Sequence, residues 1–154
     1  MQNQIKTETR LTFIQFVFST FFSDKALEDE MISFENYFYK LPVSSIEKNK
    51  ESLISFNKNY FKKLALNYNK FIKNNNIENI INPLINFERK FKNWDTINKT
   101  IILCILSEIE ITKQEKVKIL LNDYFNISKS LINKKEQGML NAITDKYLNE
   151  KKFI

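Results

Sequence analysis

The residues of this chain that could do chemistry are mostly charged, and two residue types on which many enzyme sites depend are absent or nearly absent. There is no histidine, which excludes imidazole acid–base catalysis, His-activated nucleophiles and imidazole metal ligands. The chain has one glycine, Gly138, whereas a P-loop or a dinucleotide fingerprint needs several. Carboxylate pairs such as Glu28 with Asp29, or Glu108 with Glu110, have no supporting chemistry around them. We therefore expect a protein that is not an enzyme and that has no metal site and no cofactor.

The single cysteine, Cys104, lies in the apolar run 101–106, and this favours a buried structural thiol over a nucleophile. One cysteine cannot form an intrachain disulfide, which suits a reducing, cytoplasmic location. No apolar run reaches the 18 or so residues of a membrane span. Residues 11–22 have the length of a signal-peptide core, but polar residues interrupt them and no small-x-small cleavage site follows. We expect a mature first helix there.

The charge balance is compatible with a polyanionic partner. Twenty-four Lys and Arg against 18 Asp and Glu give a formal net charge of +6 and a pI near 9.3. Solvated lysine faces are the simpler explanation of such a balance. Charge alone therefore permits nucleic-acid binding without establishing it.

The elements that must position these side chains are helices. Apolar residues recur at spacings of three and four nearly throughout, with only two prolines and one glycine between them. The length of 154 residues fits one domain. We predict an all-α fold, a single compact bundle of about seven helices over residues 1–154. The expected elements cover residues 6–22, 24–40, 44–74 with one break, 77–87 with a kink at Pro83, 97–109, 112–131 and 135–148.

Two of these helices carry unusual apolar patterns. Residues 97–109 are apolar almost all round, which places that helix at the centre of the bundle. The helix at 6–22 has apolar residues over more of its circumference than one neighbour can bury. Either two helices sandwich it, or Phe18 and Phe22 lie at a partner-binding edge.

Several strings of the sequence resemble the NusB family of bacterial transcription antitermination factors. The stretch 121–129, LNDYFNISK, and the stretch 139–146, MLNAITDK, are similar to family helices of the type INEAIELAK and FVNGVLDK. Residues 13–18, FIQFVF, resemble AVQALY, and 94–109 resemble LxxVEKAILRLALYEL, with Glu108 at the family's glutamate. Residues 136–141, EQGMLN, are similar to the DEPGMVN of alphaproteobacterial members. The matches keep the family's order and separations and weaken mainly between residues 41 and 59.

The resemblance implies a seven-helix adaptor without catalysis or a small-molecule substrate. Family members bind NusE, a small-subunit ribosomal protein, and the pair recognises boxA in nascent single-stranded RNA. That complex joins NusA, NusG and RNA polymerase, suppresses premature termination in ribosomal RNA operons and assists rRNA maturation. The same functions become our expectation for this chain.

The resemblance also implies site residues, which we carry over only where this sequence matches. The implied RNA contacts are basic, and a solvated surface charge is the alternative for each lysine: Lys6, Arg10, Arg89, Lys99 and Lys135. We favour Arg10 and Arg89 among them. The implied contacts with NusE are Phe18, Phe22, Asn98 and Glu108. Glu108 can equally be a structural polar group, and at Asn141 we expect a buried amide that bonds a neighbouring turn.

Departures from the family weaken the RNA contacts. Thr7 and Glu8 stand where many members have arginines, and Gly138 with Met139 replaces a Lys-Phe pair at the last helix. RNA binding should therefore depend more on NusE than it does in the family.

Two rival functions remain open at this point. A detached relative of the NusB-like domain in RNA cytosine methyltransferases would serve rRNA modification, although we expect no methyltransferase activity from these 154 residues, which lack the glycines of a cofactor-binding domain. A basic, Phe-rich first helix could instead dock on a membrane surface, provided that its aromatic face is exposed.

Overall fold

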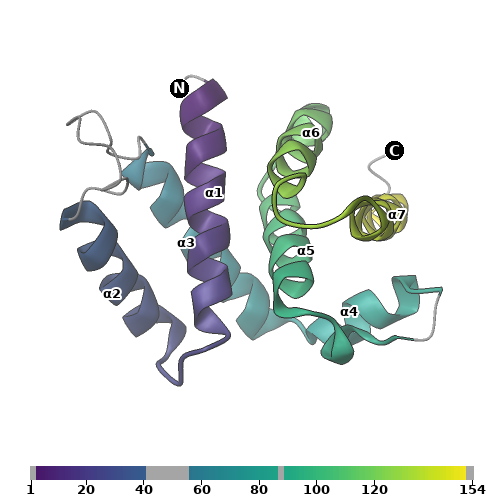
Figure 1. Cartoon of the computed structure of the whole chain (residues 1–154), viewed down its shortest axis with the longest axis horizontal. Coiled ribbons are helices and arrows are strands. Elements are labelled where there is room, and N and C mark those ends of the chain that lie inside the picture. The colour runs from purple at the N-terminus through teal and green to yellow at the C-terminus, as the bar shows by residue number, and fades with distance from the viewer. Residues whose placement is uncertain (1–2, 41–55, 87–88, 152–154) are drawn as a thin grey trace. The chain divides into compact units, whose positions relative to one another are not determined.

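A computed structural model describes residues 3–40, 56–86 and 89–151, with backbone alone for 35–40 (Figure 1). The all-α helical bundle is confirmed: the described residues form seven α-helices and three short 3-10 helices, and they contain no strand. The chain divides into two compact units, residues 1–65 and residues 66–154. The single domain stays a prediction.

Unit 1 contains α1 (Asn3–Thr20), α2 (Leu27–Lys40) and the first half of α3 (Lys58–Asn74). Aromatic rings hold these helices together. Phe16 of α1 meets Phe34 of α2 edge-on at 5.5 Å between ring centroids, and meets Phe61 of α3 at 5.8 Å. Phe34 and Phe61 stack at 5.5 Å. Such ring pairs add to the free energy of apolar burial, so this triangle is the core of unit 1.

The start of α3 is fixed by hydrogen bonds to α1. Asn57 is the residue before α3, and its Oδ1 accepts from the Tyr60 backbone N–H at 2.8 Å, as an N-cap does. The Asn57 N–H donates to Thr9 Oγ1 of α1 at 2.9 Å. Of the predicted helical stretch 44–74, residues 44–55 lie outside the described residues, and α3 begins at Lys58.

Unit 2 contains the second half of α3, then α4 (Ile77–Ile81), η1 (Asn82–Leu84), η2 (Phe91–Asn93), α5 (Thr96–Ile109), η3 (Gln114–Lys116), α6 (Val117–Ser128) and α7 (Lys134–Glu150). Pro83 lies in the first turn of η1, where α4 ends, as the predicted kink requires. Every residue from Thr100 to Ile109 is buried, which confirms the central position predicted for α5. Helix α5 contacts both α6 and α7.

Two further predictions about unit 2 have clear outcomes. Cys104 is fully buried, and this burial, followed by the nearby Glu108 charge, raises the pKa of its thiol, so the structural reading is confirmed. The buried amide predicted at Asn141 is wrong, because Asn141 is exposed on α7. The inward face of α7 is formed by Leu140, Ile143 and Tyr147, and position 141 falls on the solvent side of that stripe.

Candidate nucleic-acid interface

The segment that carries Arg89 is held in place by its own aromatic residues. Trp94 is buried and donates its indole N–H to the Arg89 carbonyl oxygen at 3.2 Å. Phe91 packs edge-to-face on Trp94 at 5.2 Å, and its backbone N–H donates to Asn82 Oδ1 at 3.0 Å. These bonds fix the backbone of residues 89–94 while the Arg89 side chain stays exposed.

Lys99, in the first turns of α5, lies against this segment. Its ammonium nitrogen is 5.7 Å from the centroid of the Phe91 ring, within the range of a cation–π contact. Asp95 occupies the N-cap position of α5, although its side chain makes no capping hydrogen bond. The Lys99 stem is half-buried, so its charge is more confined than that of a free surface lysine.

The start of α7 is tied to the start of α5. Asn98 is 5% exposed and donates Nδ2–H to Glu136 Oε2 at 2.7 Å. Glu136 also closes a capping box: its Oε1 accepts from the Asn133 N–H at 3.0 Å, and Asn133 Oδ1 accepts from the Glu136 N–H at 2.8 Å. These hydrogen bonds lower the pKa of Glu136, the backbone N–H of Asn133 first and the Asn98 amide second.

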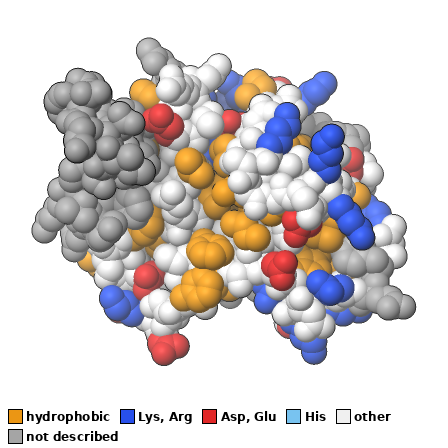
Figure 2. Space-filling model, in the orientation of Figure 1, with side chains coloured by type: hydrophobic (Ala, Val, Ile, Leu, Met, Phe, Trp, Pro, Cys, Tyr) orange, Lys and Arg blue, Asp and Glu red, His pale blue; other side chains and the backbone are white. Residues whose placement is uncertain are grey.

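Three of the predicted RNA-binding residues, Arg89, Lys99 and Lys135, therefore lie on segments that contact one another. The segment 89–94 meets α5 through Phe91 and Lys99, and α5 meets α7 through Asn98 and Glu136. Lys135 is exposed in the first turn of α7, beside Glu136. Exposed neighbours add positive charge: Lys90, Lys92 and Lys134. On the face shown in Figure 2, blue and red side chains are mixed over α5 to α7, so the candidate interface is defined by these contacts and not by one continuous basic patch.

The other two predicted RNA-binding residues, Lys6 and Arg10, lie on α1 in unit 1. Lys6 is half-buried. Arg10 is only 6% exposed; its Nη2 donates to the Tyr60 hydroxyl at 3.1 Å, and its guanidinium carbon lies 5.9 Å from the Tyr60 ring centroid. The guanidinium thus joins α1 to α3 inside unit 1, and its contact with RNA stays a prediction.

The predicted partner residues Phe18 and Phe22 form an aromatic pair in which Phe18 is half-buried and Phe22 is exposed. Their ring centroids are 5.1 Å apart, and Phe22 is 69% exposed just beyond the end of α1. Phe21 is 38% exposed beside them. In Figure 2, hydrophobic side chains reach the surface near the lower end of α1. The predicted first helix ran to Phe22, whereas α1 ends at Thr20, so the pair straddles the helix end.

The other two predicted partner residues, Asn98 and Glu108, are buried in unit 2. Glu108 is 2% exposed and accepts from the Tyr124 hydroxyl of α6 at 2.6 Å. This geometry matches the structural alternative for Glu108. Asn98 Oδ1 has no hydrogen-bond partner among the described residues. Contacts of either residue with NusE stay predictions.

Sequence reasoning missed Glu136. This residue bonds Asn98, the neighbour of Lys99 on α5, and it directly follows Lys135 on α7. A signal for it was present. Asn133 and Glu136 have the spacing of a capping box, with an amide or hydroxyl residue followed three positions later by Glu.

Other kinds of site are not found in the described part of the chain. None of its helices is both long enough and apolar enough to cross a membrane. Residues 3–40, 56–86 and 89–151 contain no group of three or more Cys, Asp or Glu side chains placed to hold a metal ion. Comparisons with family models, curated proteins and solved structures gave no match to this chain.

Proposed function

We propose that this protein is a non-enzymatic, cytoplasmic RNA-binding adaptor of the NusB type. It would hold boxA-containing single-stranded RNA together with NusE, and join NusA, NusG and RNA polymerase to suppress premature termination in rRNA operons. One observation supports this most: Arg89, Lys99 and Lys135 come from three separate elements that contacts tie together at the start of α5. The family assignment rests on the sequence resemblance alone.

The chemistry of this surface suits phosphate groups better than bases. Arg89 and Lys135 are exposed cations on a fixed backbone, and such cations gain affinity by releasing counterions from the RNA. The nearby rings of Phe91 and Trp94 are 7% and 6% exposed, so they are closed to base stacking. Phosphate contacts position an RNA but carry little sequence information. Recognition of the boxA sequence would then come largely from NusE.

The aromatic pair of half-buried Phe18 and exposed Phe22 is the proposed contact of unit 1 with NusE. Exposed aromatic residues are enriched at protein interfaces, where burying them supplies much of the binding free energy. A membrane-surface role would use the same pair. Liposome co-sedimentation separates the two, because only the membrane role predicts pelleting with anionic vesicles.

The test is a fluorescence titration of boxA RNA and a scrambled RNA, with and without NusE from the same source. We expect sequence-dependent binding only when NusE is present. Arg89→Ala, Lys99→Ala and Lys135→Ala should each reduce the slope of log affinity against log salt by roughly 0.7, the value for one phosphate contact with a single strand. Lys118→Ala, an exposed lysine of α6, is the matched control and should leave the slope unchanged. Unchanged slopes for all three variants would reject this RNA surface.

A further inference from the structure

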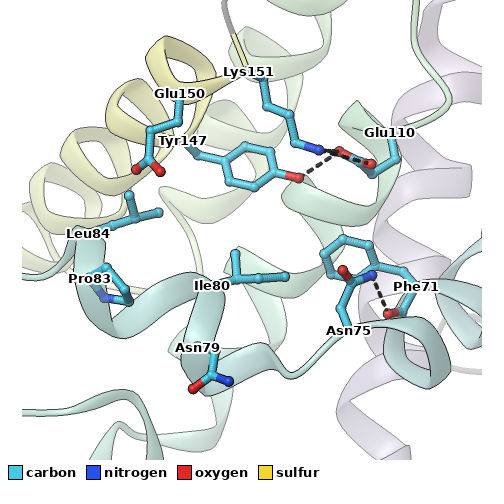
Figure 3. Close-up of a pocket in the computed structure, with 10 residues that line it drawn as sticks. All are labelled: Phe71, Asn75, Asn79, Ile80, Pro83, Leu84, Glu110, Tyr147, Glu150 and Lys151. Atoms are coloured by element: carbon cyan, nitrogen blue, oxygen red, sulfur yellow. Dashed lines mark hydrogen bonds and ion pairs between the residues drawn. The ribbon is translucent and has the colours of Figure 1, made fainter.

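Unit 2 has a cavity at some distance along α5 from the candidate RNA surface. Its volume is about 430 Å³, and it lies among the ends of α3, α5 and α7 and the short helix α4 (Figure 3). Phe71, Ile80 and Leu84 supply apolar walls, and the Tyr147 ring crosses the opposite side. A volume of this size is within the range of cavities that bind small molecules or peptide side chains.

The polar part of the cavity is arranged around Glu110. The Tyr147 hydroxyl donates to Glu110 Oε2 at 2.6 Å, and Lys151 Nζ lies 3.2 Å from the same oxygen. Burial first, and then the Glu110 carboxylate, raises the pKa of Tyr147, so this hydroxyl stays a neutral donor. Glu110 is therefore held in one orientation by two donors, and the Lys151 charge is already matched.

Glu150 differs from Glu110 because its side chain is exposed and its carboxylate makes no hydrogen bond or ion pair with any described residue. Figure 3 places its side chain at the cavity beside Leu84. Lys146, one turn earlier on α7, donates instead to the Leu84 carbonyl oxygen at 3.3 Å. The carboxylate of Glu150 is thus a negative charge available to a ligand at the cavity.

Helix ends add to this negative character. Phe71 lies in the last turn of α3 and Asn75 directly follows that helix. Glu110 is the C-cap of α5, and Tyr147 and Glu150 lie in the last turn of α7. The C-terminal end of a helix carries a partial negative charge on its unpaired carbonyl groups. Three such ends line one cavity in a chain whose net charge is +6.

We propose that this cavity binds an arginine or lysine side chain of a partner peptide. The aliphatic stem of the side chain would lie on Phe71 and Ile80, and the cationic head would pair with Glu150. The two carboxylates and the helix ends disfavour phosphate groups, so the occupant is a basic peptide and not RNA. This site does not depend on the proposed RNA surface and would hold even if that surface failed its test.

The experiment is an NMR titration of the ¹⁵N-labelled full chain. The probe is the blocked peptide acetyl-Leu-Arg-Leu-amide, and its control is the same peptide with citrulline, which has the shape of arginine without the charge. We expect shifts of the Ile80 and Tyr147 amides with arginine, and binding weaker by about fivefold with citrulline, the size of a partly exposed ion pair. Glu150→Gln should weaken binding of the arginine peptide by a similar factor.

A matched variant keeps the result interpretable. Glu115→Gln changes the net charge equally at an exposed position of η3 that does not line the cavity, and it should leave peptide affinity unchanged. Equal binding of the two peptides, equal loss in both variants, or shifts of the same amides caused by an oligouridylate RNA would each overturn the proposal. Salt-dependent RNA binding at Arg89 is measured separately, so failure of one site is distinguishable from failure of the other.

Discussion

Replacing Glu136 with Gln should weaken folding and strengthen RNA binding at the same time. The carboxylate accepts two hydrogen bonds through two oxygens, from the Asn133 N–H and the Asn98 amide. Glutamine has one acceptor oxygen, so one of these donors loses its partner. The expected loss is about 1–2 kcal/mol of unfolding free energy, the size of one charge-assisted hydrogen bond at a helix cap.

The RNA effect has the opposite sign because a negative charge disappears beside Lys135. A phosphate about 10 Å away in water gains roughly 0.4 kcal/mol when that repulsion is removed, which is about a twofold tighter complex. Trp94, the only tryptophan, is buried at this surface, so its fluorescence can follow both urea unfolding and RNA binding. Glu115→Gln is the control, since it alters the same charge on η3 without touching the cap.

The pH dependence of the unfolding free energy tests whether the Glu136 carboxylate causes the loss of stability. The folded-state pKa of Glu136 is lowered below 4.5, so its contribution to stability is complete above pH 4.5 and is lost as pH falls through the folded-state pKa. The stability gap between the natural protein and Glu136→Gln should therefore be full at pH 7 and shrink below pH 4.5. A gap that does not shrink as the pH falls below 4.5, no gap at pH 7, or weaker RNA binding by the variant would refute this reasoning.

Three further outcomes are expected. Tyr124→Phe should lower the unfolding free energy by about 1–3 kcal/mol in urea denaturation, because it removes a donor from the buried Glu108; unchanged stability with lost NusE binding would instead favour Glu108 as a partner contact. Cys104 should react slowly with dithiobis(nitrobenzoate) at pH 8 and quickly in guanidinium, because burial raises its pKa, and fast reaction of the folded protein would contradict this. Arg10→Ala should lower thermal stability by about 1–2 kcal/mol through loss of its contacts with Tyr60; a flatter salt slope for RNA without loss of stability would make Arg10 a phosphate contact.

The helices of this chain could be predicted from sequence because their signals are local. Apolar spacing and the shortage of Gly and Pro define α5, and Pro83 marks the end of α4. The predicted ends of α1 and α2 were less accurate than the positions of the helices themselves. Helix α1 begins at Asn3 and ends at Thr20, and α2 begins at Leu27, because fraying and turn geometry at helix ends are set by a few weak interactions.

The site was less predictable because it depends on which distant residues meet. No local pattern shows that Asn98 will bond Glu136, 38 positions away, or that Arg10 will donate a hydrogen bond to Tyr60. A sequence shows that an arginine is present but not whether its guanidinium remains exposed. The prediction for Asn141 failed for a different reason, because a shift of one position on a helix moves a side chain by about 100° around the axis.

The length of helix α5 separates the candidate RNA surface from the proposed peptide-binding cavity. The candidate RNA surface lies at its first turns and the cavity at its C-terminal cap, Glu110. Fourteen residues of α-helix span roughly 20 Å. Ionic screening in physiological salt acts over about 8 Å, so a polyanion at one end of α5 would barely alter the potential at the other. A small domain with this spacer could hold an acidic polymer and a basic peptide at once, without either ligand repelling or attracting the other out of place.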